Sequence, residues 1–174
     1  MTRAASLLGL MIALALAFGA CGDGEKKDGG DGAAGPLTLE QYFDKLQPLA
    51  TKLDEDGNAL DQRIRGTLDI DEAKSVFGEY VTVLEGFVDE LETLEPPAQA
   101  QQAHDGAVAA GRAFAAEFQR AVDQGRDAET FEDLFAGAEG ESFGAASEAF
   151  TATCFALEQV ADDNGITVDL GCRE

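Results

Sequence analysis

The chain of 174 residues contains no tryptophan, a single histidine and only two methionines, and these shortages exclude several kinds of cofactor protein. Both methionines, Met1 and Met11, lie in the first twenty residues, so a haem held by histidine and methionine inside a helical bundle lacks a ligand. A ferritin-like pair of metal ions needs two Glu-x-x-His motifs, which one histidine cannot supply. Covalent haem attachment needs a Cys-x-x-Cys-His sequence, and none occurs. The sequence therefore predicts no cofactor and no metal site.

Basic residues are scarce as well. The chain has 12 Lys and Arg residues against 34 Asp and Glu residues, and its formal net charge is −22 at pH 7. Such a surface repels the phosphates of nucleic acids, so we expect no nucleic-acid partner. It attracts cations diffusely, which leaves a cation buffer as one weak alternative function.

One acidic segment has the beginning of a calcium-binding pattern. In the sequence DEDGN, Asp54, Asp56 and Asn58 match the first three ligand positions of a calcium loop. Arg65 stands where that loop requires a bidentate glutamate, and the glycine comes too early. We therefore interpret residues 54–58 as a solvated bulge in a helix.

Catalytic patterns are missing too. The sequence holds no phosphate-binding loop, no dinucleotide fingerprint and no Ser/His/Asp arrangement. A nucleophile and base would have to be built around His104 alone. Since His104 lies on an apolar helical stripe, we interpret it as a structural histidine and keep it as a weak candidate for ligand binding. We expect no enzymatic activity.

The N-terminal residues carry the strongest motif. Arg3 is followed by an apolar run from Ala4 to Ala20, which is short for a membrane span and is typical of an export signal. Small residues precede Cys21, and this pattern resembles the bacterial lipoprotein signal. The resemblance implies cleavage before Cys21 and fatty acyl chains such as palmitate on that cysteine. An ordinary secretory signal that leaves a free thiol at Cys21 is the alternative.

The lipoprotein resemblance gives a domain organisation and a location. Residues 1–20 would be the signal peptide, residues 21–36 a lipidated cysteine with a flexible Gly/Asp-rich tether, and residues 37–174 a helical domain. Two acyl chains hold a protein stably on a bilayer, whereas one holds it marginally. The expected location is therefore extracytoplasmic, with the lipid anchor in a bacterial membrane.

Apolar residues repeat at helical spacing throughout the body of the chain. Four stripes joined by short turns predict an all-α fold, an up-down antiparallel four-helix bundle with a short extended C-terminal tail. Pro48 should kink or interrupt the first helix, and the glycine-rich stretch 136–144 should break the fourth. The expected helices cover residues 39–66, 69–95, 98–124 and 130–164.

Three cysteines are an odd number for an exported chain. If Cys21 carries lipid, Cys154 and Cys172 remain as a pair in a compartment that permits disulfides. The helix after Cys154 rises ~15 Å to its expected end, and the chain after Gly165 reaches back up to ~24 Å. A disulfide therefore forms if the tail doubles back along its own helix, with apolar residues of segment 166–170 facing the bundle. A redox-active or intermolecular pair is the alternative.

Two further segments resemble known proteins. The sequence LTLEQ, residues 37–41, matches the Leu-Thr-x-x-Gln signature of small periplasmic chaperones, and helix capping explains it equally well. Residues 91–104 and the ending G-x-x-x-x-L-G-C are similar to segments of uncharacterised secreted helical-bundle proteins of bacteria. The second resemblance supports the architecture alone.

These observations favour a non-catalytic binding or interaction module whose partner, a protein or a small molecule, the sequence does not name. The first alternative is a bundle that binds a small apolar ligand between its helices. Small residues on the apolar stripes, such as Gly111, Gly137 and Gly144, would leave the space for it. A chaperone-like protein is the remaining weak alternative.

Overall fold

A computed structural model describes residues 37–138 and 140–172, and all regular structure within these ranges is helical. The all-α prediction is therefore confirmed, whereas the predicted signal, Cys21 and the tether lie outside the described residues. None of the helices in the described ranges is long and apolar enough to cross a bilayer. The elements are α1 (Leu39–Gly66), α2 (Ile70–Glu92), α3 (Gln101–Gln124), the 3-10 turn η1 (Gly125–Asp127), α4 (Phe131–Ala136) and α5 (Glu141–Asp163).

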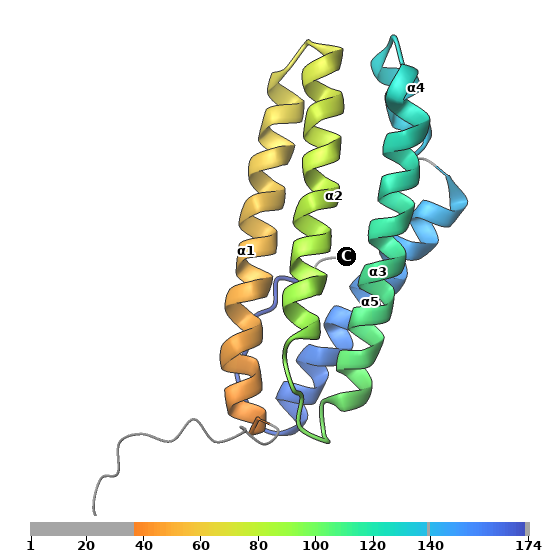
Figure 1. Ribbon diagram of the computed structural model, residues 1–174. Helices are drawn as coiled ribbons and strands as arrows, with labels where there is room; N and C mark the ends of the chain where they lie inside the picture. Colours follow the sequence, from red (N-terminus) through yellow and green to blue (C-terminus); the bar gives the residue numbers. More distant parts are fainter. Residues whose placement is uncertain (1–36, 139, 173–174) are drawn as a thin grey trace, which may run out of the picture. The chain divides into compact units, whose positions relative to one another are not determined.

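Each long helix packs against its neighbour in the sequence. Helix α1 lies along α2, α2 along α3, and α3 along α5, which crosses α3 obliquely (Figure 1). The short helix α4 contacts α3 and η1. After α5 the chain turns back, and its last described residues run beside α1 (Figure 1). We call this returning segment, residues 165–172, the tail.

The helices begin where side chains can accept their first backbone N–H groups. Thr38 and Gln41 form a reciprocal capping box at α1, as the sequence predicts. The carboxylate of Asp69 accepts the N–H groups of Asp71 and Glu72 at the start of α2. Thr130 caps α4 through the N–H of Asp133. Local sequence thus sets three of the helix starts.

Helix α1 bears on two predictions, the kink or interruption at Pro48 and the bulge at residues 54–58. It continues through Pro48 without interruption. The proline removes the N–H that would bond to the carbonyl of Asp44, and both residues are exposed, so water can bond that carbonyl instead. Residues 54–58 are regular helix rather than a bulge, with Asn58 donating to Asp54 at 3.0 Å and Lys52 paired to Asp56.

The predicted fourth helix is divided within the glycine-rich stretch, as the sequence predicts, so the described part of the chain has five helices. Its first part, α4, ends at Gly137, where an added Cβ would lie 2.9 Å from the Cα of Ala121. Helix α5 begins at Glu141, inside the stretch 136–144 where the sequence predicts the break. The glycine-rich stretch therefore allows α4 to lie against α3 before the chain sets off again as α5.

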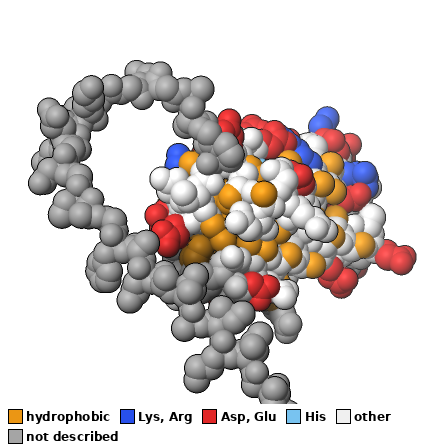
Figure 2. All heavy atoms as spheres, turned by 90° about the horizontal axis from the view of Figure 1, so that it is seen from below, with side chains coloured by type: hydrophobic (Ala, Val, Ile, Leu, Met, Phe, Trp, Pro, Cys, Tyr) orange, Lys and Arg blue, Asp and Glu red, His pale blue; other side chains and the backbone are white. Residues whose placement is uncertain are grey.

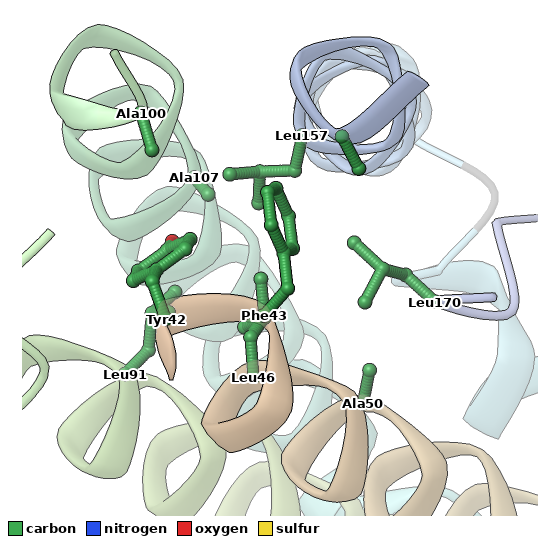
Figure 3. Close-up of a cluster of buried hydrophobic side chains, with 10 residues drawn as sticks. Tyr42, Phe43, Leu46, Ala50, Leu91, Ala100, Ala107, Leu157 and Leu170 are labelled. Atoms are coloured by element: carbon green, nitrogen blue, oxygen red, sulfur yellow. The ribbon is translucent and has the colours of Figure 1, made fainter. Parts of the chain in front are cut away.

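The buried side chains form two clusters. The larger one joins α1, α2, α3, α5 and the tail, and in Figure 3 Phe43 points toward Leu157 while Leu170 points in from the tail. The smaller one surrounds Phe77 and Leu134 near α4 and η1. Figure 2, an end view, shows apolar side chains gathered toward the middle of the described face, with acidic side chains at its edge.

Candidate functional site

The larger cluster does not fill its space completely. A cavity of about 250 Å³ lies among α1, α2, α3, α5 and the tail. Apolar side chains dominate its wall, and among the described residues that line it Asp54 is the one that carries a charge. The lining residues are Leu46, Ala50, Leu53, Asp54, Phe87, Leu91, Ala107, Phe150, Thr151, Thr153, Cys154, Leu157, Leu170, Gly171 and Cys172.

Helical spacing brings these residues to one place. On α1, Leu46, Ala50 and Asp54 follow one another at intervals of four residues and so share a face. On α5, Phe150, Cys154 and Leu157 form a similar row. The space remains because alanines occupy two positions of the stripes, Ala50 (8 % exposed) and Ala107 (3 % exposed), where a leucine would reach across.

The tail supplies one wall of the cavity. Gly165 adopts a left-handed conformation with φ of +72°, and the N–H of Ile166 bonds back to the carbonyl of Ala161, which reverses the chain after α5. Leu170 then enters the core with 7 % of its surface exposed, and its N–H donates to Oε1 of Glu158 at 2.9 Å. The tail is therefore packed and hydrogen-bonded rather than loosely laid on the surface.

A disulfide fixes the end of this wall. Cys154 on α5 and Cys172 in the tail are bonded, with their Cα atoms 5.7 Å apart. This is the pairing that the cysteine count and the reach of the chain predict. Both cysteines line the cavity, so the bond holds the tail against α5 at the site itself.

The mouth of the cavity is polar. A second hollow, of about 330 Å³, shares five lining residues with the cavity and opens between α1 and the tail. It adds Gln47, Thr51 and Asp169 to the shared residues. Asp169 accepts the N–H of Gly171 at 2.9 Å, which keeps its carboxylate at the turn beside the cavity. The apolar cavity therefore adjoins a more polar hollow, whose described lining includes the carboxylates of Asp54 and Asp169.

A third hollow, of about 190 Å³, lies between α1 and α2 and shares Leu53 and Phe87 with the cavity. It contains Lys52, whose pKa is raised by its hydrogen bond and ion pair with Asp56 and by the nearby Glu90. The lysine charge is therefore matched by two carboxylates.

The candidate residue His104 lies elsewhere. It is 5 % exposed, and its Nδ1 shares a hydrogen bond of 3.1 Å with the hydroxyl of Tyr42, which is fully buried. Burial lowers the pKa of His104 and raises that of Tyr42, so both groups favour their neutral forms. His104 does not line the cavity among the described residues, and its bond to Tyr42 agrees with the structural interpretation of this histidine.

The glycines that the sequence suggested as the source of a cavity do not line it. A Cβ on Gly111 would lie 2.7 Å from Cγ2 of Val88, so this glycine allows close helix packing. Gly137 contacts Ala121, and Gly144 faces open space. Sequence reasoning missed Ala50 and Ala107, and the signal that could have found them is an alanine at a core position of a leucine-rich stripe.

A row of aromatic rings extends away from the cavity. Phe87 and Phe150 meet at its wall with ring centroids 6.1 Å apart, and Phe150 stacks on Phe114 at 5.8 Å. The contacts continue toward the smaller cluster through Phe143, Phe118, Phe77, Tyr80, Phe135 and Phe131. These rings bring α2, α3, α4 and α5 together, which explains how a chain without tryptophan fills its core.

The described residues contain no group of three or more His, Cys, Asp or Glu side chains that could hold a metal ion. Comparison with known proteins adds no relative: no family model, no curated protein and no solved structure matches this chain. The cavity, its lining and its charges are therefore the features from which a function has to be inferred.

Proposed function

We propose that this chain is a lipid-anchored protein of the bacterial cell envelope whose helical domain binds a small apolar molecule in the cavity beside the disulfide. In this proposal the four long helices act as an up-down antiparallel four-helix bundle. The tail stands between α1 and α5. The observation that carries the proposal is the cavity itself, an apolar space of about 250 Å³ bounded by four helices and the tail.

The volume sets the size of the ligand. An apolar cavity of about 150 Å³ accommodates benzene, which has six carbon atoms. In proportion, 250 Å³ suits a molecule of about ten non-hydrogen atoms. The cavity volume is below that of typical pockets for drug-sized ligands, which is roughly 300–1,000 Å³. The proposed ligand is thus a compact hydrocarbon or aromatic molecule rather than a long acyl chain.

The lining favours binding over catalysis. Its polar side chains are Asp54, Thr151 and Thr153, and the hydroxyl of Thr153 donates to the carbonyl of Phe150 at 2.7 Å. Among the described lining residues there is no histidine or lysine to act as a base for either threonine, and the carboxylate of Asp54 already accepts a hydrogen bond from Asn58. We therefore propose a non-catalytic binding module.

The membrane anchor rests on the sequence alone, on the apolar run that ends in small residues before Cys21. The test is fractionation of the host cells with the parent and with Cys21→Ser, together with the intact mass of each protein. Acylated parent in the membrane fraction and unacylated variant outside it are expected. Equal membrane retention of both proteins, without added lipid mass, would overturn the anchor.

Binding is tested by calorimetric titration of the full chain carrying Cys21→Ser with 2-phenylethanol, a neutral molecule of suitable size. Ala50→Leu fills the cavity and should abolish binding. Ala59→Leu is the matched control, since Ala59 lies exposed on the same helix. Saturable binding that only Ala50→Leu removes supports the proposal, whereas no saturable heat in the parent, or equal binding in both variants, refutes it.

A further inference from the structure

The tail closes one side of the cavity, between α1 and α5. It lines the hollow of about 330 Å³ together with α1, and the disulfide joins it to α5. Figure 3 shows Leu170 reaching from the tail into the space between Ala50 on α1 and Leu157 on α5. Displacement of the tail would therefore open the cavity on this side.

Few backbone hydrogen bonds hold the tail. Among the described residues, the N–H of Ile166 bonds to the carbonyl of Ala161, and the N–H of Leu170 bonds to the side chain of Glu158. The N–H of Gly171 bonds within the tail itself. A segment without regular secondary structure and with few such bonds opens at a lower cost in free energy than the helices do.

A glycine at each end of the tail allows the chain to turn there. Gly165 and Gly171 have φ values of +72° and +70°, a left-handed conformation that other residues rarely adopt. A Cβ on either glycine would meet nothing within 4 Å, so neither position is held by close packing. Glycine changes its backbone angles at low steric cost, and these two positions are therefore suited to act as hinges.

The disulfide is the covalent link across this closure. Cys154 belongs to α5 and Cys172 to the tail, and both cysteines are half-buried. Cys172 also lines the hollow between α1 and the tail, which gives a small dithiol a route to the bond. Once the bond is reduced, the tail is joined covalently to α5 only through Gly165.

We infer that the tail is a redox-controlled strap: it covers the cavity while Cys154 and Cys172 are bonded, and it lets the ligand pass when a dithiol reduces the bond. The part that concerns the ligand rests on the proposed function, because the strap covers the same cavity. The buried side chain of Leu170 holds the reduced tail in place for most of the time. Reduction therefore changes how often the strap opens and leaves the helices folded.

The reduction is an exchange between thiols and a disulfide. One thiolate of the dithiol attacks a sulfur of the bond between Cys154 and Cys172, and the other cysteine leaves as a thiolate. The second thiolate of the dithiol then attacks the mixed disulfide and releases the first cysteine. The two cysteines gain two electrons and two protons, and the dithiol loses the same number of each as it becomes a disulfide.

Amide hydrogen exchange followed by NMR tests the strap without any ligand. In the full chain carrying Cys21→Ser, Cys154 and Cys172 are the only cysteines. Reduction with dithiothreitol should speed exchange of the Leu170 amide at least about tenfold, because the bond no longer restrains the tail.

Dilute urea distinguishes opening of the strap from unfolding of the domain. In the reduced protein, exchange at Leu170 should be faster than at Val88, which is buried in α2, and should change little with urea, because local opening exposes little surface. The inference is overturned if reduction leaves exchange at Leu170 unchanged, or if Leu170 and Val88 exchange together in the reduced protein.

Two variants separate the disulfide from a general loss of stability. The double replacement of Cys154→Ser and Cys172→Ser should give the same fast exchange at Leu170 without a reductant. Leu134→Ala is the matched control, because Leu134 is buried in the smaller cluster and its loss destabilises the domain without touching the disulfide. With the bond intact, Leu170 in this variant should exchange together with Val88. Faster exchange at Leu170 than at Val88 in Leu134→Ala would refute the role of the bond.

Passage of the ligand is tested with 2-(4-fluorophenyl)ethanol, whose fluorine resonance reports exchange between the free and the bound probe. This exchange should be at least about tenfold faster in the reduced protein than in the oxidised one. If the probe binds but exchanges at the same rate in both forms, the tail does not control passage and the inference is refuted. If the probe binds neither form, the proposed function fails, and the amide exchange alone decides whether the strap opens.

Discussion

The hydroxyl of Tyr42 on α1 lies 3.1 Å from Nδ1 of His104 on α3, and the two rings meet edge to face with centroids 5.8 Å apart. The helices α1 and α3 are not neighbours in the sequence, so this buried pair connects parts of the domain that α2 separates. Each residue supplies the other with the polar partner that burial requires. The pair is therefore a defined point of contact inside an otherwise apolar core.

Replacing Tyr42 with phenylalanine removes the hydroxyl and leaves His104 without this partner. We expect the free energy of unfolding to fall by about 1–3 kcal/mol, the cost of an unsatisfied buried polar group. Tyr80→Phe is the comparison, because the Tyr80 hydroxyl hydrogen-bonds to the carbonyl of Gly57 and to the carboxylate of Asp61 but is only half-buried. Urea unfolding of both variants measures the difference, and a larger loss in Tyr80→Phe would contradict the assignment.

The lowered pKa of His104 makes stability depend on pH in a known direction. Because burial disfavours the imidazolium in the folded state, the unfolded chain binds more protons below its ordinary pKa of about 6.5. This contribution to stability is complete above about pH 6.5 and is lost as the pH falls toward the folded-state pKa.

Urea unfolding at pH 8.0 and pH 5.5 checks this dependence on pH. Between these two pH values His104→Gln should lose less stability than the parent, because the variant has no histidine to protonate. The two proteins have the same carboxylates, so the losses that these cause are equal and cancel in the comparison. Equal losses in the two proteins would show that His104 is not the group responsible.

The disulfide should stabilise the folded chain mainly by restricting the unfolded one. Replacement of both Cys154 and Cys172 by serine removes a closed loop with a sequence separation of 18 residues. The expected loss in the free energy of unfolding is about 3 kcal/mol. Urea unfolding of the double variant measures it, with the parent under reducing conditions as a check. A double variant as stable as the oxidised parent would show that the bond contributes nothing.

Gly111 should tolerate no side chain. A Cβ at this position would lie 2.7 Å from Val88 and 3.3 Å from Phe150, so Gly111→Ala forces α3 away from its neighbours. We expect a loss of about 1–3 kcal/mol, as for other overpacked cores. Gly78→Ala on α2 is the control, because a Cβ there meets nothing within 4 Å. It should stabilise its helix by up to about 1 kcal/mol, and thermal unfolding distinguishes the two directions.

Leu170 should be the main apolar contact of the tail. Leu170→Ala removes a side chain that is 7 % exposed and borders the cavity, and the expected loss is about 2–5 kcal/mol. Val168→Ala, at a half-buried position of the same segment, should cost less. Denaturant unfolding of the two variants provides the comparison, and equal losses would mean that Leu170 has no special place in the core.

Local chemistry explains what could be predicted from the sequence. The capping box at Thr38, the end of α1 at Gly66 and the end of α5 before Gly165 follow from side chains and backbone freedom within a few residues. The return of the tail is expected from the cysteine pair and from the reach of the chain after Gly165, and Ile166, Val168 and Leu170 face the core in the structure.

The site was less predictable because its features arise between helices. In the sequence an alanine such as Ala50 indicates only a residue that favours helix. The position of the tail in the structure shows that space remains beside it. The proximity of Asp54 to Asp169 depends on a chain reversal more than a hundred residues later. Pro48 shows the limit of a local rule, which predicts a kink or an interruption. The helix is not interrupted there, because water can bond the carbonyl that the proline leaves without an N–H partner.

The packing of each long helix against its neighbour in the sequence has a consequence for the order of events during folding. Topologies dominated by such nearby contacts fold in microseconds to milliseconds, whereas thiol oxidation takes seconds to hours. Newly synthesised chains should therefore spend an early period with their helices already paired and both thiols still reduced. During that interval the tail wall of the cavity is held by the apolar contacts of Ile166, Val168 and Leu170 and by hydrogen bonds, without the disulfide, so oxidation acts as a late maturation step.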